Sequence, residues 1–418
     1  MRIKFSFQLL KALLPRILIT FIILIFIRAG TFLPVPGIDH NDLAAAIQQN
    51  LVAKNLIRTF LGDKIIIIGL FTLNIFPAIN ATIILQFLIG FSPQLAKLQK
   101  EGDFQGRREI SRLTRNITVV LAIIQSIGLT LYLRPILFNW NLMLASQLVL
   151  WLTAGAMIVL WLSEVITDYG LGNGTSVLVY INIVSNLPNL IDKIINENRD
   201  NTAVLSVVSM SGLVLLILFA LYAIVLLQNS TLIINLISSK RLSRTSSNSY
   251  AKKKSESYLP LRFNQAGVMP IILTTSFLVI PNYLINLGIF QSLNFLTDFK
   301  WIYWIGYFVL ILAFSSFYSS IVLNPKDISD QLQKSAVKIP GVRPGVQTIF
   351  YLKQEIQRIT LMGATLLAFI TIVPNFIEST LNITSLSGLS TTSFLILGGV
   401  ILDLKREISN IYYSEIYR

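Results

Sequence analysis

Residues 142–163 read LMLASQLVLWLTAGAMIVLWLS, a long apolar segment without Asp, Glu, Lys or Arg, and this segment decides the fold class. A helix needs roughly 20 mostly apolar residues to cross the hydrocarbon core of a bilayer. The segment is therefore predicted to be a transmembrane helix. Nine further stretches meet the same criterion: 17–34, 66–90, 116–133, 174–191, 203–228, 267–290, 301–323, 359–377 and 384–402.

The composition of the whole chain agrees with this interpretation. Of the 418 residues, 54% are hydrophobic and 13% are charged, whereas soluble proteins carry about 25% charged residues. The chain has no cysteine and a single histidine, His40, which argues against disulfides, Cys/His zinc sites and thiol nucleophiles. We therefore expect an all-α integral membrane protein with ten transmembrane helices and with no catalytic residue, metal or cofactor.

Basic residues are distributed unequally between the two sides of this ten-span chain. Of 34 Lys and Arg residues, 26 lie in the two terminal segments or in the loops 91–115, 238–262 and 324–358. The positive-inside rule puts this side, with both termini, in the cytoplasm or its organellar equivalent. We interpret the N-terminus as a retained first helix rather than a cleaved signal peptide, because no small-residue cleavage site follows it.

The middles of the predicted spans contain amides and hydroxyls but no ionisable group, and the one charge within a span, Arg28, lies near its far end. The polar residues are Asn74, Asn80, Thr82, Gln86, Gln125 and Asn264. Such side chains either join neighbouring helices by hydrogen bonds or line a hydrated path. Secondary transporters usually carry ionisable groups at this depth, so the pattern argues against ion-coupled transport.

The second and seventh spans each begin with Asn and Pro among small residues, at 74–80 and 264–270. Interrupted helices at matching positions in two halves are typical of an inverted repeat. We expect an N-terminal half, 1–192, with helices 1–5, and a C-terminal half, 193–418, with helices 6–10. Because the uncharged run 203–237 exceeds one span, its later part is expected to continue as an irregular loop.

The C-terminal half also contains two large basic loops, 229–265 and 324–358. Arg343 lies between two Pro-Gly pairs, which predicts an exposed position at the tip of a stiff turn. The basic loops either set topology and contact anionic lipid or form a docking surface for a large partner. The Ser-, Asn- and Lys-rich stretch 238–256 is expected to be flexible.

Several motifs point to one family. They are FLPVPGID at 32–39, the segment 77–86 with EG at 101–102 and GRR at 106–108, WLSEVITD at 161–168, GLGNGTS at 170–176, LPLRFN at 259–264 and PGVRPG at 340–345. Together they resemble the SecY/Sec61-alpha family, the channel subunits of the Sec protein translocase, along almost the whole chain.

The resemblance implies two pseudo-symmetric five-helix halves around a central hourglass pore. The ring of aliphatic side chains at the waist would consist of Ile79, Ile83, Val179, Ile272 and Ile396. A plug would correspond to about 55–68. Thr82, Gln125 and Asn264 match polar positions of a lateral gate, through which apolar segments leave into the lipid bilayer.

The resemblance also implies partners. Arg107, Arg108 and Arg343 match the surface on which a SecA-like motor ATPase or a ribosome docks, and small SecE-like and SecG-like membrane subunits would complete the complex. Energy would come from the partner, since the chain has no phosphate-binding glycine loop. Precursor polypeptides with signal sequences would be the substrate. Contact with nucleic acid is expected only through a bound ribosome.

Two features depart from the family pattern. The loop at 229–258 lacks the tight basic hairpin of the family, and the tail after the tenth span is short. With the abundance of Ile, Asn and Lys, the short tail favours a plastid-encoded subunit of the chloroplast thylakoid membrane over a bacterial inner membrane. The sequence thus predicts a passive protein-conducting channel; the alternatives are a five-plus-five secondary transporter and, third, a membrane enzyme.

Overall fold

The structure is a computed structural model and describes residues 7–35, 69–100, 104–133, 141–197, 218–238, 257–264, 267, 269–271, 273–274, 300–381 and 391–416. Within these residues, five helices are long and apolar enough to cross a membrane: Leu13–Thr31, Arg108–Leu131, Leu142–Tyr169, Trp304–Lys334 and Val346–Val373. Three shorter apolar helices are Phe76–Phe91, Gly174–Ser185 and Leu218–Asn229. Each of these eight overlaps a different predicted span.

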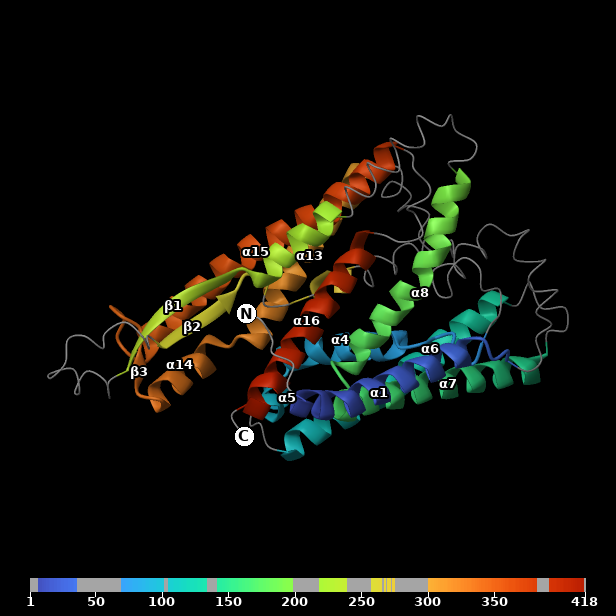
Figure 1. Cartoon of the computed structure of the whole chain (residues 1–418), viewed down its shortest axis with the longest axis horizontal. Coiled ribbons are helices and arrows are strands. Elements are labelled where there is room, and N and C mark those ends of the chain that lie inside the picture. Colours follow the sequence, from blue (N-terminus) through green and yellow to red (C-terminus); the bar gives the residue numbers. More distant parts are fainter. Residues whose placement is uncertain are drawn as a thin grey trace. The chain divides into compact units, whose positions relative to one another are not determined.

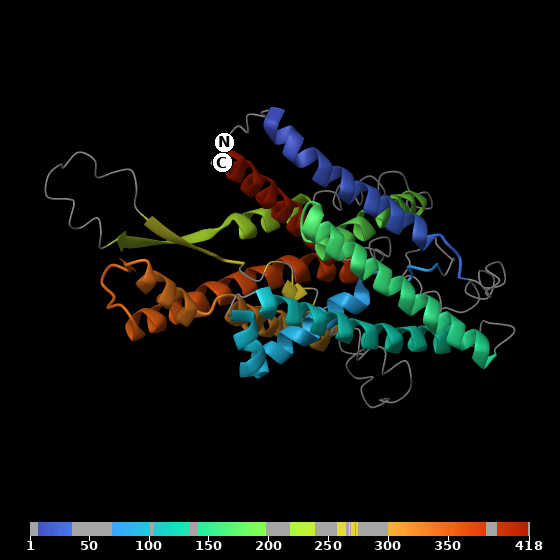
Figure 2. The same ribbon diagram turned by 90° about the horizontal axis from the view of Figure 1, so that it is seen from below.

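The chain divides into two compact units. The first contains α1 (Phe7–Thr31), α4 (Phe76–Phe91), α5 (Pro93–Lys100), α6 (Phe104–Leu133), α7 (Leu142–Tyr169) and α8 (Gly174–Glu197). In this unit α6 packs against both α4 and α7, and α7 also contacts α1 and α8 (Figures 1 and 2). The helix α7 therefore lies in contact with three neighbours.

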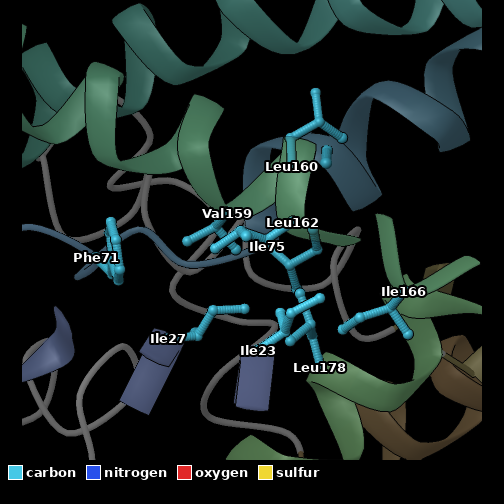
Figure 3. Packing of buried hydrophobic residues seen from close by; sticks show 10 residues of the cluster. Ile23, Ile27, Phe71, Ile75, Val159, Leu160, Leu162, Ile166 and Leu178 are labelled. Atoms are coloured by element: carbon cyan, nitrogen blue, oxygen red, sulfur yellow. The ribbon is translucent and has the colours of Figure 1, made fainter. Parts of the chain in front are cut away.

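The core of the first unit is formed by aliphatic and aromatic side chains from several helices (Figure 3). Ile27 of α1, Val159 of α7 and Leu178 of α8 are all buried in it. The opposite face of α1 is equally apolar but exposed, with Phe21 and Ile25 more than half accessible. Exposing an apolar face of this size to water is unfavourable, so the face suits contact with lipid. Within lipid, helices associate through side-chain packing rather than through the hydrophobic effect.

The second unit combines helices with a small sheet. It contains the helix Leu218–Asn229, β1 (Thr231–Ser238), β2 (Ser257–Arg262), α13 (Lys300–Val322), α14 (Pro325–Lys334), β3 (Val337–Lys338) and α15 (Val346–Leu381). The strand order is β2-β1-β3, and both pairings are antiparallel. The last helix, α16 (Thr391–Ile416), contributes residues before Val400 to this unit and later residues to the first.

The expectation of an irregular loop at the end of the 203–237 run is wrong, because residues 231–238 form β1. Side chains alternate along this strand: Ile233 is exposed, whereas Ile234 is buried. The period of two belongs to a strand with one face against a core. Figure 1 shows β1 and β2 as a long twisted ribbon.

The basic loops are also more structured than a loop assignment suggests. The segment 324–358 consists largely of α14, β3 and the first turns of α15, and α6 begins at Phe104, well before its apolar part. Buried Ile234 of β1, Leu261 of β2 and Leu352 of α15 share one apolar core with Ile339. This cluster forms a compact core around the N-terminal turns of α15, before the apolar part of that helix. We call the strands and helices that contribute to this core the strand subdomain.

Candidate functional site

The two halves of the predicted ring lie in different units, so each is described separately. In the first unit, Ile79 and Ile83 lie one turn apart on α4, and Ile79 packs at the edge of the core. Val179 of α8 packs at the edge of the same core. All three side chains are half-buried. The structure thus brings Ile79 and Val179 to the margin of one cluster.

Ile396, a further member of the predicted ring, belongs to the second unit. Ile396 is half-buried and lies in the first turns of α16. Ile272 lies outside the described residues, as does the plug assigned to 55–68.

The start of α4 is fixed by Asn74. Its backbone has a φ of 47°, a left-handed conformation that Asn tolerates better than most residues. The Asn74 side chain accepts a hydrogen bond from the Ile75 N–H (2.9 Å), and its Nδ2 donates to Oδ1 of Asn182 in α8 (2.9 Å). Asn74 therefore joins two helices, one of the two roles expected for it. No sequence signal identified its partner, which lies 108 residues away.

The predicted gate residues differ in how their polar groups are satisfied. Thr82 donates to the Ala78 carbonyl of its own helix (2.8 Å), and Asn264 Nδ2 donates to the Gly267 carbonyl (2.9 Å). The side-chain oxygen of Gln125 is buried and has no hydrogen-bond partner within the described part of the chain. Leaving such an oxygen unpaired costs about 1–3 kcal/mol, so Gln125 favours an environment that offers it a donor.

Two polar contacts that sequence reasoning missed join α6 to α7. Arg115 donates two hydrogen bonds to the Glu164 carboxylate, at 2.9 and 2.7 Å, and Ser126 and Thr153 share a hydroxyl bond at 3.2 Å. The Arg115 side chain is 53% exposed, so solvent screening limits the ion pair to less than about 1 kcal/mol. Because two guanidinium nitrogens donate to the same carboxylate, the contact is also directional, and it links α6 to α7 at one defined position.

Arg343 lies in the turn between β3 and α15, and its side chain is exposed. Its carbonyl accepts a hydrogen bond from the Thr348 hydroxyl (2.9 Å), and nearby Ile339 is buried in the strand subdomain. The main chain around Arg343 is thereby anchored while the guanidinium faces outward. In the other unit, Arg107 and Arg108 lie near the start of α6, and Arg108 is exposed.

Sequence comparison identifies relatives along the chain. Residues 69–405 match the SecY family. A protein translocase subunit SecY from Trieres chinensis is 54% identical over 415 residues, which is 97% of each chain. A subunit of the same name from Synechocystis is 40% identical over 96% of this chain and 92% of its own.

Solved structures share the fold at low sequence identity. One, described as the structure of a protein-conducting channel, has a TM-score of 0.64 and is 16% identical, covering 99% of this chain and 95% of its own. Another, Sec61 in the canine ribosome–channel complex from the endoplasmic reticulum, has a TM-score of 0.60 at 14% identity, over 99% and 95% of the two chains. The predicted fold class is therefore confirmed.

Proposed function

The chain belongs to the SecY family, and from this membership we propose that it is the central subunit of a channel that passes unfolded secretory precursors across a membrane. The observation that carries the proposal is the 54% identity to a protein translocase subunit over nearly the full length of both chains. A channel of this kind is passive and catalyses no reaction. It provides the aqueous path that an unfolded chain needs, because unpaired backbone groups in hydrocarbon cost several kcal/mol each.

The waist of the pore is assigned to Ile79, Ile83, Val179, Ile272 and Ile396. A narrow aliphatic constriction expels water, so it resists ion flow and yet can separate around an extended polypeptide. The half-buried positions of Ile79 and Val179 support the assignment, because a pore-lining side chain is neither packed away nor fully exposed. The segment 55–68 is assigned to a plug that would close the pore.

The lateral gate is assigned to Thr82, Gln125 and Asn264. A polar boundary between helices opens more readily than an apolar one, since water or an entering signal helix can replace its hydrogen bonds. The buried side-chain oxygen of Gln125 has no hydrogen-bond partner among the described residues, and this supports the role, because an entering donor could satisfy it. Sufficiently apolar segments leave through this gate into the bilayer as helices.

The basic face is the docking side for the partner that drives transport, a SecA-like motor or a ribosome. Arg107, Arg108 and Arg343 are assigned to this surface, and the anchored turn that exposes Arg343 supports its part in docking. The likeness to a channel solved together with a ribosome supports a ribosome as one partner. Small SecE-like and SecG-like subunits complete the complex in the membrane.

The chain is a multi-pass membrane protein, and we assign it to the chloroplast thylakoid membrane with both termini in the stroma. The abundance of Ile, Asn and Lys and the relative from Trieres chinensis support a plastid origin. The excess of basic residues on one side supports the orientation.

Reconstituted transport tests the proposal. The purified chain, with its SecE-like subunit and a SecA-like motor, is placed in vesicles, and protease-protected precursor is measured with and without ATP. Protected precursor is expected only with ATP and an intact signal sequence. An assembled, motor-binding complex that protects no precursor would overturn the proposal, and uptake of a small solute instead would favour the transporter alternative.

A further inference from the structure

Among the described helix glycines that lie against a main-chain carbonyl oxygen, Gly155 and Gly363 form a pair with one member in each unit; Gly106 of α6 and Gly174 of α8 also do so, both in the first unit. A Cβ on Gly155 of α7 would collide with the carbonyl oxygen of Leu70, and a Cβ on Gly363 of α15 would collide with that of Phe263. Both glycines are buried. The obstacle in each case is backbone, which cannot rotate away as a flexible side chain can, so any larger residue must displace the neighbouring segment.

The two contacts occupy corresponding places in the two five-helix halves. The helix α7 contains the fourth predicted span and α15 the ninth, so each glycine belongs to the fourth helix of its half. Leu70 leads into α4, the second helix of the first half, and Phe263 leads toward the seventh predicted span, in which the described residues 269–271 and 273–274 are helical. We call Leu70 and Phe263 the lead-in residues.

The N–H groups of the lead-in residues are also held in the same way. The Leu70 N–H donates to the carbonyl of Leu33 (3.0 Å), and the Phe263 N–H donates to the carbonyl of Ser230 (3.1 Å). Leu33 lies just after α1, and Ser230 directly follows the helix Leu218–Asn229. In each half, the lead-in residue is therefore fixed on one side by the end of the first helix and on the other by the glycine of the fourth.

Each lead-in residue directly precedes the segment assigned to the pore and the gate. After Leu70 the chain is buried through Ile75, and α4 then presents Ile79 and Ile83. After Phe263 comes Asn264, whose side chain donates to the Gly267 carbonyl. The lead-in residue of the first half thus lies shortly before Asn74 and α4, and that of the second half lies directly before Asn264.

We propose that Gly155 and Gly363 are positioning residues that set the start of these two helices and thereby hold the channel closed. The proposal rests on the proposed function. A methyl group at either glycine would push the lead-in residue out of its place and weaken the N–H bond to the preceding helix end. The side chains that the helix carries toward the proposed pore would then shift with it.

The test compares Gly155→Ala and Gly363→Ala with two matched controls, Gly128→Ala in α6 and Gly306→Ala in α13. Within the described residues, nothing lies within 4 Å of a Cβ placed on either control glycine. The full chain is studied with its SecE-like subunit in lipid nanodiscs, and amide hydrogen exchange is measured residue by residue.

Exchange at Leu70 is expected to be about tenfold faster in Gly155→Ala than in the unaltered chain, because overpacking weakens that local hydrogen bond. Exchange at Phe263 should rise similarly in Gly363→Ala, each variant affecting its own half only. Unchanged exchange, or an equal rise in the controls, would overturn the proposal. If a variant does not accumulate, rapid exchange at Leu70 and Phe263 in the unaltered chain would overturn it as well.

Ion conductance of the reconstituted complexes separates this proposal from the proposed function. Both glycine variants should conduct ions without a precursor, and so should Ile79→Asn, which alters the ring directly. If Ile79→Asn leaks and the glycine variants stay closed, the positioning role is wrong and the channel stands. A third outcome is that none of the three variants conducts ions while exchange at Leu70 and Phe263 rises as expected. The glycines then position the lead-in residues but do not keep the channel closed, and the ring assignment is wrong.

Discussion

At the scale of single residues, the decisive contacts join positions far apart in the sequence. The Asn74–Asn182 bond ties the start of α4 to α8 across 108 residues. The composition of the spans indicates that an amide there needs a partner, but it does not identify the partner, because many helix pairs could supply one. By contrast, the exposed turn at Arg343 was predictable, since Pro and Gly determine it locally.

The ring assignment leads to a prediction for Ile79. Ile79→Asn should let the reconstituted channel conduct ions in the absence of a precursor, because a polar side chain allows water to occupy a narrow aliphatic constriction. Ile79→Leu, which keeps the site aliphatic, is the control and should stay closed. The measurement is single-channel conductance in planar bilayers; equal conductance of Ile79→Asn, Ile79→Leu and the unaltered chain would remove Ile79 from the ring.

The docking assignment leads to a prediction for Arg343. Arg343→Glu should lower motor-driven transport by about tenfold or more, since reversing a charge at a docking contact adds repulsion to the lost attraction. Lys338→Glu makes the same charge change at a nearby exposed residue and should have a much smaller effect. Transport is measured with saturating precursor. Equal losses in both variants would point to net charge rather than to Arg343.

At the scale of elements, the sequence predicts the apolar parts of helices well and their extensions poorly. Hydropathy finds the spans because lipid demands apolar residues, but α6 and α15 continue into the basic loops, where a helix needs no apolar stretch. The strand β1 was missed because it forms the end of the long uncharged run 203–237, in which the alternation of exposed and buried residues along the strand is hard to recognise. Its partner β2 lies beyond a stretch rich in Ser and Lys. The pairing register of the two strands depends on contacts between distant residues, which the local sequence does not reveal.

The strand subdomain is predicted to be stable as a local unit. Leu352→Ala should destabilise it by about 2–5 kcal/mol, because Leu352 is fully buried and its truncation leaves a cavity. The control Phe350→Ala removes a side chain that is 70% exposed and should change little. Amide exchange at Ile234 and Leu261 checks this: both should speed up in Leu352→Ala while α4 stays unchanged. Exchange that rises equally in α4 would contradict a separate subdomain.

At the scale of the whole molecule, the distribution of charge predicts the orientation in the membrane. Because the chain has no natural cysteine, a single introduced cysteine is the only thiol in it that a reagent can label, and its labelling shows on which side of the membrane it lies. Ser335 and Asn141 are exposed and fall on opposite predicted sides. A membrane-impermeant thiol reagent should reach Ser335→Cys only from the side of the termini and Asn141→Cys only from the other. Labelling of both from one side would refute the ten-span orientation.

The fold class of the whole molecule could be predicted from the sequence because lipid and charge act on every span alike. Ring and gate residues could be proposed only through family motifs, since an isoleucine that lines a pore looks like one that packs in a core. Half-buried Ile79 and Val179 illustrate the point: their pattern in the sequence is that of ordinary helix packing.

The proposed channel requires that a precursor thread between aliphatic side chains contributed by both halves of the chain. Photo-crosslinking tests this requirement with a photoreactive amino acid at Ile83, at Ile272 and, as a control, at the exposed Ile25 of α1, while a secretory precursor is stalled in transit. We expect crosslinks to the precursor from Ile83 and Ile272 and none from Ile25. A fully assembled complex in which neither Ile83 nor Ile272 reaches the stalled precursor would contradict the channel.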